Sequence, residues 1–347
     1  MLNKANNQIW LISLASLLVL SIIISTAIGP VEIKWIDLLD LLNDDIGPEN
    51  SLNVLIDIRL PRVLSAVVIG AALGLSGALT QALFRNPLAD PALLGITSGA
   101  GLAIAMLMIV IPLFNQIIDL HNSILQWSYS VAAFLGAVCM CQVLLWLSRL
   151  MSLVSISSLL LCGLALNALA SALIGICIYL ANDQQLRTFT FWTLGSLSGV
   201  TWASLWILSV GLGLGIAMVL SLAPQLNALA MGDGVAKHLG VNLPRIRFMS
   251  ILCVALLCGL CVAVSGVIGF ISLIAPQMIR VLIGSDHRMV LPASMLTGAV
   301  LLVIADALSK NLASPTEMPV GIFTALIGAP YFLYLLSKKS HQEVHSI

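Results

Sequence analysis

Residues 84–95 read FRNPLADPALLG and separate two long runs of Leu, Ala and Gly. This stretch decides where one helix ends and where the next begins. Pro87 disfavours helix at the residue before it, so the preceding helix is expected to stop near Arg85. Asp90 can cap the following helix, and Pro91 suits its first position. The stretch therefore predicts a tight polar turn between two apolar helices.

The runs on both sides of this turn have the composition of a membrane protein. Of the 347 residues, 60% are hydrophobic and 9% are charged, and the mean hydropathy is +1.08. A water-soluble domain cannot bury so much apolar surface. Within hydrocarbon only helices and closed barrels satisfy every backbone polar group, and the apolar runs here are about 20 residues long rather than short and alternating. The predicted fold class is an all-α polytopic membrane protein.

Ten apolar segments have the length of a membrane-spanning helix. We interpret the first as a retained helix, because it is longer than a signal-peptide core and lacks a strongly basic start; a cleaved signal is the alternative. Gly70, Gly74 and Gly77 give the second segment a small-residue face for close helix packing. The predicted spans are 10–29, 62–84, 91–111, 127–148, 157–180, 203–222, 247–266, 268–284, 290–309 and 319–337.

The basic residues indicate how the spans are oriented. With an even number of spans both termini lie on one side, and placing that side in the cytoplasm puts ten of the 15 Lys and Arg residues inside. This distribution follows the excess of positive charge found in cytoplasmic loops. We therefore expect both termini to be cytoplasmic. The five basic residues on the outer side are then Lys34, Arg59, Arg62, Arg187 and Lys310.

Two polar connections carry further local structure. Residues 231–247, MGDGVAKHLGVNLPRIR, lie on the predicted inner side. Asp233 can cap a short helix running through Lys237, and Gly240 can end it. We favour a docking surface over a simple connector for this segment. Residues 181–202, ANDQQLRTFTFWTLGSLSGVTW, predict an interfacial helix-turn-helix on the outer side.

Motifs of catalysis and of energy coupling are missing. No lysine follows a glycine, so the chain has no GxxxxGK[ST] phosphate loop, and HExxH and GxSxG are also absent. If ATP drives this protein, another polypeptide binds the ATP. Asp306 lies inside a predicted span, where Lys310 can pair with it at i, i+4. An ion-coupled secondary transporter, with Asp306 as its coupling site, is the alternative of a different class.

The seven cysteines lie within apolar runs. Cys258 and Cys261 have the spacing of a redox or metal pair, but no His or carboxylate cluster stands beside them. They are therefore interpreted as small apolar helix residues, and no metal site is predicted.

Several segments in combination resemble the FecCD-type permeases, the transmembrane subunits of ABC importers for iron chelates, haem and cobalamin. The resemblance runs from about residue 55 to residue 337. The segments are IRLPRVLSAVVIGAALGLSGALTQALFRNPLADPALLGITSGAGLA, NALAMGDGVAKHLGV, SGVIGFISLIAPQMIR, SDHRMVLPAS and TEMPVGIFTALIGAPYFLYLL.

The resemblance implies the BtuC-like fold of type II ABC importer permeases, with residues 1–347 forming one transmembrane domain in the bacterial inner membrane. The implied partners are a second copy of the chain, two ATP-binding subunits, a periplasmic binding protein, the metal chelate and membrane lipid, and no nucleic acid. ATP and Mg would be bound by the ATPase subunits, with no cofactor on this chain. The chain is thus expected to be a transport subunit and not itself an enzyme.

The resemblance also assigns roles to single residues. Docking of the binding protein falls on Arg59, Arg62 and Lys310. Coupling to the ATPase falls on the segment 232–240, with Gly232, Asp233, Ala236, Lys237, Leu239 and Gly240. The inner gate falls on Ser155, Ile156 and Ser157. The family places the opening turn near the cytoplasmic end of the translocation path, and a gating contribution from Asn86 and Leu88 is our hypothesis on that basis. Gln277 stands where many family members carry histidine, which puts any role of that histidine in doubt for this chain.

Haem is the cargo that the resemblance favours, because FWTLGSLSGVTW together with RNPLADPALLGITSGAGLA resembles haem permeases. Ferric siderophores and cobalamin are the alternatives within the same family.

Overall fold

The computed structural model describes residues 4–29, 53–115, 122–150, 156–312 and 317–344, and within these ranges it is helical and contains no strand. Ten long helices in the described ranges coincide with the ten predicted spans. They are α1 (Lys4–Ala27), α4 (Leu60–Phe84), α5 (Ile96–Asn115), α6 (Asn122–Leu150), α7 (Ile156–Leu180), α9 (Trp202–Ala230), α11 (Leu243–Ser265), α12 (Ile271–Ile283), α13 (His287–Leu312) and α14 (Val320–Val344). The all-α prediction is confirmed.

Four short helices connect or extend the long ones. A π-helical turn, η1 (Val54–Arg59), leads into α4, and a 3-10 turn, η2 (Pro91–Leu94), precedes α5. The others are α8 (Asp183–Thr193) and α10 (Asp233–His238).

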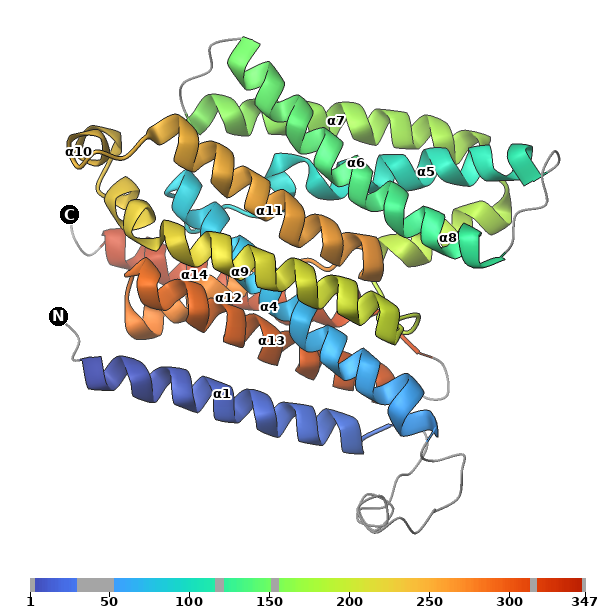
Figure 1. Cartoon of the computed structure of the whole chain (residues 1–347), viewed down its shortest axis with the longest axis horizontal. Helices are drawn as coiled ribbons and strands as arrows, with labels where there is room; N and C mark the ends of the chain where they lie inside the picture. Colours follow the sequence, from blue (N-terminus) through green and yellow to red (C-terminus); the bar gives the residue numbers. More distant parts are fainter. Residues whose placement is uncertain (1–3, 30–52, 116–121, 151–155, 313–316, 345–347) are drawn as a thin grey trace.

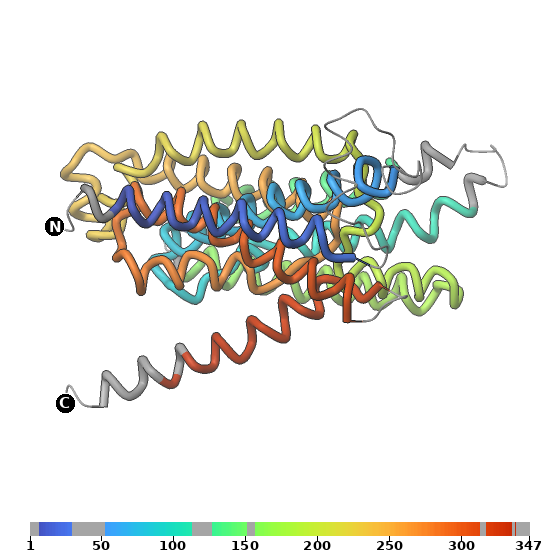
Figure 2. Tube along the Cα trace, turned by 90° about the horizontal axis from the view of Figure 1, so that it is seen from below, coloured from blue at the N-terminus to red at the C-terminus, as the bar shows by residue number. Residues whose placement is uncertain are grey.

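Within the described residues, seven helices are long and apolar enough to cross a membrane, and α5, α12 and α14 contain shorter apolar stretches. The long helices run in roughly the same direction (Figure 1). The two chain ends lie at one end of the bundle together with α10, and α8 lies at the opposite end (Figure 1). Figure 2 shows both chain ends at the same end from a second direction. Helix α1 thus begins, and α14 ends, at the same end of the bundle, as an even number of spans requires.

Helix α4 lies at the centre of the bundle, and 83% of its apolar stretch of 18 residues is buried. It contacts α9, α11, α12 and α13. The predicted small-residue face explains the close approach. A Cβ atom added at Gly70 or Gly74 would collide with the backbone of Gly298 or Ser294 in α13, and one added at Gly77 would collide with the carbonyl oxygen of Ser272 in α12. Only residues without a side chain allow backbones to come so near.

Several predictions were wrong in detail, such as the end of the sixth span, which lies at Ala230 rather than at residue 222. The third span begins at Ile96 rather than at residue 91, because Gly95 takes a left-handed conformation (φ 84°) and separates the short turn η2 from α5. Residues 181–202 form one helix, α8, followed by a turn into α9, and not a helix-turn-helix. The side chains of Asn182 and Gln185 make a capping box that starts α8, and the first residues of α9 are capped by Thr201.

Candidate functional site

Helix α10 lies at the end of the bundle where the termini lie (Figure 1), and exposed apolar side chains form a ridge there. Val235 in α10 and Leu239 directly after it are 40% and 62% exposed, and Met231, two residues before α10, is 67% exposed. The spacing of four residues places Val235 and Leu239 on one face of α10, while Met231 caps the end of α9 and is separated from α10 by the non-helical Gly232. The opposite side holds Ala236, which is fully buried against the ends of α9 and α11. An exposed apolar ridge at the tip of an anchored helix is typical of a protein docking surface.

The carboxylate of Asp233 joins three elements of the fold. Its Oδ1 lies 2.8 Å from Nη2 of Arg85, at the end of α4, and its Oδ2 lies 2.8 Å from Nη2 of Arg247 in α11. The prediction that Asp233 caps the short helix is therefore wrong. The capping position is taken by Gly232, whose φ of 111° favours glycine. The prediction that Gly240 ends the helix is confirmed, since its φ is 80° and its N–H donates to the carbonyl of Lys237.

The turn from 84 to 95 is built by its own polar side chains. Helix α4 ends at Phe84, as predicted, and Arg85 follows in a left-handed conformation with a φ of 49°. Asn86 Oδ1 then accepts a hydrogen bond from the backbone N–H of Leu88 at 3.0 Å. Asp90 Oδ1 accepts from the N–H of Ala92 at 2.8 Å, which confirms its predicted capping role.

The same turn is attached to two other helices. Ser272 of α12 donates a hydrogen bond to Asp90 Oδ2 at 2.6 Å. Asn167 of α7 donates through Nδ2 to the carbonyl of Ala92 at 3.1 Å, and its Oδ1 accepts from Ser98 of α5 at 2.5 Å. The turn is thus bonded at both ends: Arg85 contacts α10, while Asp90 and Ala92 contact α12 and α7.

The residues predicted to form the gate are only partly within the described chain. Asn86 and Leu88 are exposed in the 84–95 turn. Ile156 is the first residue of α7, and Ser157 follows it with an exposed side chain. Ser155 lies outside the described residues. Gln277 lies in α12, half buried.

The three cations predicted to receive the binding protein lie together at the end of the bundle opposite α10, and they are buried. Arg59, Arg62 and Lys310 are 5%, 5% and 4% exposed. Nε of Arg62 lies 2.9 Å from Oδ1 of Asp306, and Lys310 Nζ lies 3.1 Å from Oδ2 of the same carboxylate. The predicted i, i+4 pair of Asp306 and Lys310 is confirmed.

Acceptors within the chain hold these cations. Arg62 Nη1 lies 2.8 Å from each carboxylate oxygen of Glu317, whose side chain is 39% exposed. Arg59 Nη1 donates to the carbonyl of Thr26 at 3.0 Å, and Lys310 donates to the hydroxyl of Ser25 at 3.1 Å. The cluster therefore ties α1, α4, α13 and the segment before α14 together at this end.

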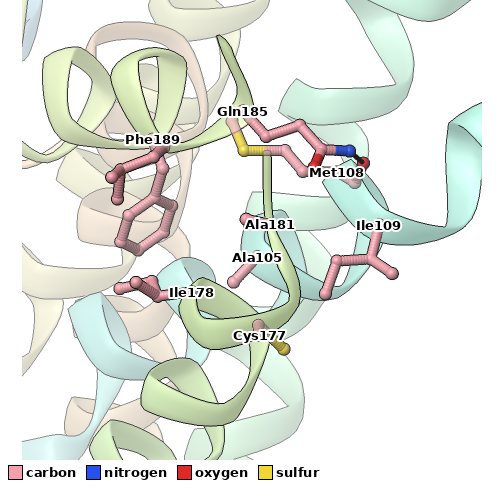
Figure 3. A pocket seen from close by; sticks show the side chains of 9 residues that line it. Ala105, Met108, Ile109, Cys177, Ile178, Ala181, Gln185 and Phe189 are labelled. Carbon is pink, nitrogen blue, oxygen red and sulfur yellow. Dashed lines mark hydrogen bonds between the residues drawn. The ribbon is translucent and has the colours of Figure 1, made fainter. Parts of the chain in front are cut away.

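Helix α8 is fastened to α5 at the same end as this cluster. Gln185 belongs to its capping box, and its Nε2 also donates to the carbonyl of Met108 at 2.6 Å (Figure 3). Phe189 points toward Ile178 of α7 across a small pocket (Figure 3). The space inside is about 10 Å³, roughly that of one water molecule. This seam fixes α8 to α5 and α7 and is too small for a chelate.

A polar cluster at the end of α9 that leads into α10 was not singled out from the sequence. Asn227 donates through Nδ2 to Asp286 at 2.7 Å, and its Oδ1 accepts from the backbone N–H of His287 at 2.9 Å and from the ring Nδ1 at 2.7 Å. Burial tends to raise the pKa of Asp286, but hydrogen bonds from the N–H of Arg288 and from Asn227, together with nearby positive charge, lower it overall. The cluster joins the helix that leads into α10 to the start of α13. The only sequence signal was an asparagine near the end of a span.

Comparison with known proteins agrees with this architecture. The model of the FecCD transport family matches residues 17–338. The hemin transport system permease protein HmuU of Yersinia pestis is 46% identical over 290 residues, which cover 84% of this chain and 85% of that protein. The vitamin B12 import system permease protein BtuC of Vibrio cholerae is 38% identical over 280 residues, with 81% of each chain covered.

A solved structure, described as an inward-facing conformation of a metal-chelate type ABC transporter, superposes with a TM-score of 0.81 at 31% identity and covers 96% of this chain and 99% of that one. The family model extends over most of the helical bundle, including the 84–95 turn, α10 and the buried ion cluster. The chain therefore belongs to the FecCD transport family, the membrane permease subunits of ABC transporters.

Proposed function

We propose that this chain is the permease of an ATP-driven importer whose cargo is haem. The cargo assignment is supported by the 46% identity to a hemin permease over 84% of the chain. Ferric siderophores and cobalamin are the competing cargoes, the second because relatives at 38% and 36% identity are vitamin B12 permeases. The chain supplies the path and makes no covalent change in the cargo.

The observation that carries the ATP-driven mechanism is the exposed ridge on α10. In the proposed assembly two ATP-binding subunits dock on the two ridges of a permease pair, bind ATP and Mg, and move α10 as they close and open. Movement of α10 then opens a path between the two copies toward the cytoplasm. Met231, Val235 and Leu239 supply the apolar contact, while Lys237 stands exposed beside them.

The first experiment replaces apolar ridge residues by charge. Val235→Glu and Leu239→Glu are expected to abolish co-purification of the ATPase subunits, because a carboxylate in the contact cannot be desolvated without a partner. Arg245→Gln is the matched control, since it changes an exposed residue of α11 outside the 232–240 segment without burying charge. Retention of the ATPase by both ridge variants would contradict the proposal.

The second experiment identifies the cargo. Proteoliposomes containing the assembled complex and its binding protein are offered labelled hemin with an excess of unlabelled hemin, a ferric siderophore or cobalamin. Haem as cargo predicts that only unlabelled hemin competes strongly and that uptake requires ATP. Strong competition by one of the other two chelates would reassign the cargo within the family.

We further propose that the periplasmic binding protein docks over the cluster of Arg59, Arg62 and Lys310. In this structure the three cations already have acceptors within the chain, so docking requires acidic groups of the binding protein to take over part of these contacts. Arg59 donates to the backbone carbonyls of Thr26 and Ala27, whereas Arg62 and Lys310 pair with buried Asp306. Arg59→Gln is thus the cleaner test, and weaker binding-protein association at low salt, with the difference lost at high salt, is expected.

A further inference from the structure

Residues 84–95 contact the proposed coupling surface at one end and two helices of the bundle at the other. We propose that this segment is the mechanical link of the permease. It receives the displacement of α10 through the ion pair between Arg85 and Asp233 and passes it to α7 and α12. The inference rests on the proposed docking of the ATPase at α10 and assigns Arg85 and Asp233 as positioning residues.

The entry point is a charged contact at the end of α4. Arg85 Nη2 and Asp233 Oδ1 lie 2.8 Å apart, and both side chains are partly exposed, at 33% and 39%. A partly exposed ion pair of this kind adds little to the stability of the fold. We therefore assign it a positional role, in which it holds α10 against the end of α4. Arg85 sits in the left-handed region, where a residue with a side chain is uncommon. The backbone there turns sharply out of α4, and the guanidinium reaches α10.

The segment between entry and exit has few soft torsions. Pro87 and Pro91 fix two backbone φ angles. The side chains of Asn86 and Asp90 close two short turns by bonding to backbone N–H groups two residues further on. A shift of Arg85 therefore cannot easily be absorbed within the turn and is passed along it.

The exit points are the hydrogen bonds to α12 and α7. Ser272 contacts Asp90 at 2.6 Å, and Asn167 contacts the carbonyl of Ala92 at 3.1 Å. Helix α7 begins at Ile156, beside the segment predicted to form the inner gate, and Ser157 in its first turn is exposed. A displacement that reaches Asn167 is thus delivered to the helix that starts at the gate.

Asp233 itself offers the matched comparison. Its second oxygen pairs with Arg247 at the same 2.8 Å. Arg247, however, belongs to α11, which follows α10 in the chain through residues 239–242. Loss of that pair leaves α10 attached to the 84–95 segment, whereas loss of the Arg85 pair removes the link. Substituting each arginine in turn therefore distinguishes transmission of the displacement from local anchoring of α10.

The test uses the assembled complex in proteoliposomes and needs no knowledge of the cargo. The seven native cysteines are replaced by alanine and Ser157→Cys is introduced. The rate of labelling by a maleimide is measured without nucleotide and with MgATP and vanadate. In the linked permease the two rates are expected to differ by about two- to thirtyfold, the range in which coupling residues act.

Arg85→Gln and Asp233→Asn are each expected to bring the ratio of the two labelling rates close to one, and the double variant to do no more than either single one. Arg247→Gln is expected to retain the wild-type ratio. Co-purified ATPase and its hydrolysis rate monitor assembly in every variant. An unchanged ratio in Arg85→Gln, an equal loss in Arg247→Gln, or additive effects in the double variant would each overturn the inference. Failure of the underlying docking proposal is distinct, because then the ridge variants of α10 would retain the ATPase.

Discussion

At the scale of single residues, the buried ion cluster shows how one carboxylate stabilises two neighbouring cations. Asp306 is fully buried and lies between Arg62 and Lys310. An unpaired carboxylate in that position would lose its hydration without compensation. Both of its oxygens are occupied by cations of this chain, so Asp306 is a structural counterion. With the family established, the secondary-transporter alternative built on Asp306 is set aside.

The cluster predicts a strong contrast between its two acids. Asp306→Asn leaves two buried cations short of charge and is expected to lower the free energy of unfolding by about 3–5 kcal/mol. Glu317→Gln removes a partly exposed partner of Arg62 and is expected to cost less than about 1 kcal/mol. Thermal and denaturant unfolding of the purified protein in detergent measures both. Equal and small losses of unfolding free energy in the two variants would show that the contribution of Asp306 does not depend on its burial.

At the scale of elements, helix α4 owes its central place to the small-residue face that meets α12 and α13. Gly77 lies against the carbonyl of Ser272, and a Cβ atom there has no room. Gly175 lies in α7, where a Cβ atom would meet nothing within 4 Å. The same chemical change therefore has opposite consequences in the two helices.

Gly77→Ala is expected to destabilise the protein by about 1–3 kcal/mol or more, because α12 must move away from α4. Gly175→Ala is the matched control, and it is expected to be neutral or to stabilise by up to about 1 kcal/mol, the helix propensity gained by alanine. Melting temperatures of the two variants in the same detergent decide the matter. A destabilised Gly175→Ala protein, with Gly77→Ala unaffected, would contradict the packing argument.

At the scale of the whole molecule, the two ends of the bundle carry different chemistry. One end has both termini and α10, while the other has α8 (Figure 1). The contact of Asn227 with Asp286 lies near the end of α9 that leads into α10, and the ion pair of Arg62 with Asp306 lies near the start of α4, at the other end. The excess of Lys and Arg on the side of the termini favours the cytoplasm for that end. Arg187 in α8 and Lys237 in α10 are both exposed and mark the two ends.

This orientation predicts opposite labelling of two single-cysteine variants made without the native cysteines. Arg187→Cys is expected to react with a membrane-impermeant maleimide in intact spheroplasts. Lys237→Cys is expected to react only after the membrane is permeabilised. The reverse pattern would place both termini outside.

Local chemistry determined the helices of this protein. Apolar runs near the thickness of a bilayer, Pro87 after Arg85, Asp90 before Ala92 and Gly240 after α10 act within one or two turns of backbone, so the residues themselves are sufficient to predict them. The i, i+4 pair of Asp306 and Lys310 was predictable for the same reason, since helical spacing alone brings the two side chains together.

Only the tertiary structure decided where charged side chains find their partners. Arg62 meets Asp306 across 244 positions of the chain, and Arg85 meets Asp233 across 148. Helical periodicity specifies which face a side chain occupies and leaves open which helix that face will meet. The burial of the proposed docking cations and the bridging role of Asp233 were therefore hidden in the sequence, because both arise from the packing of distant helices around α4.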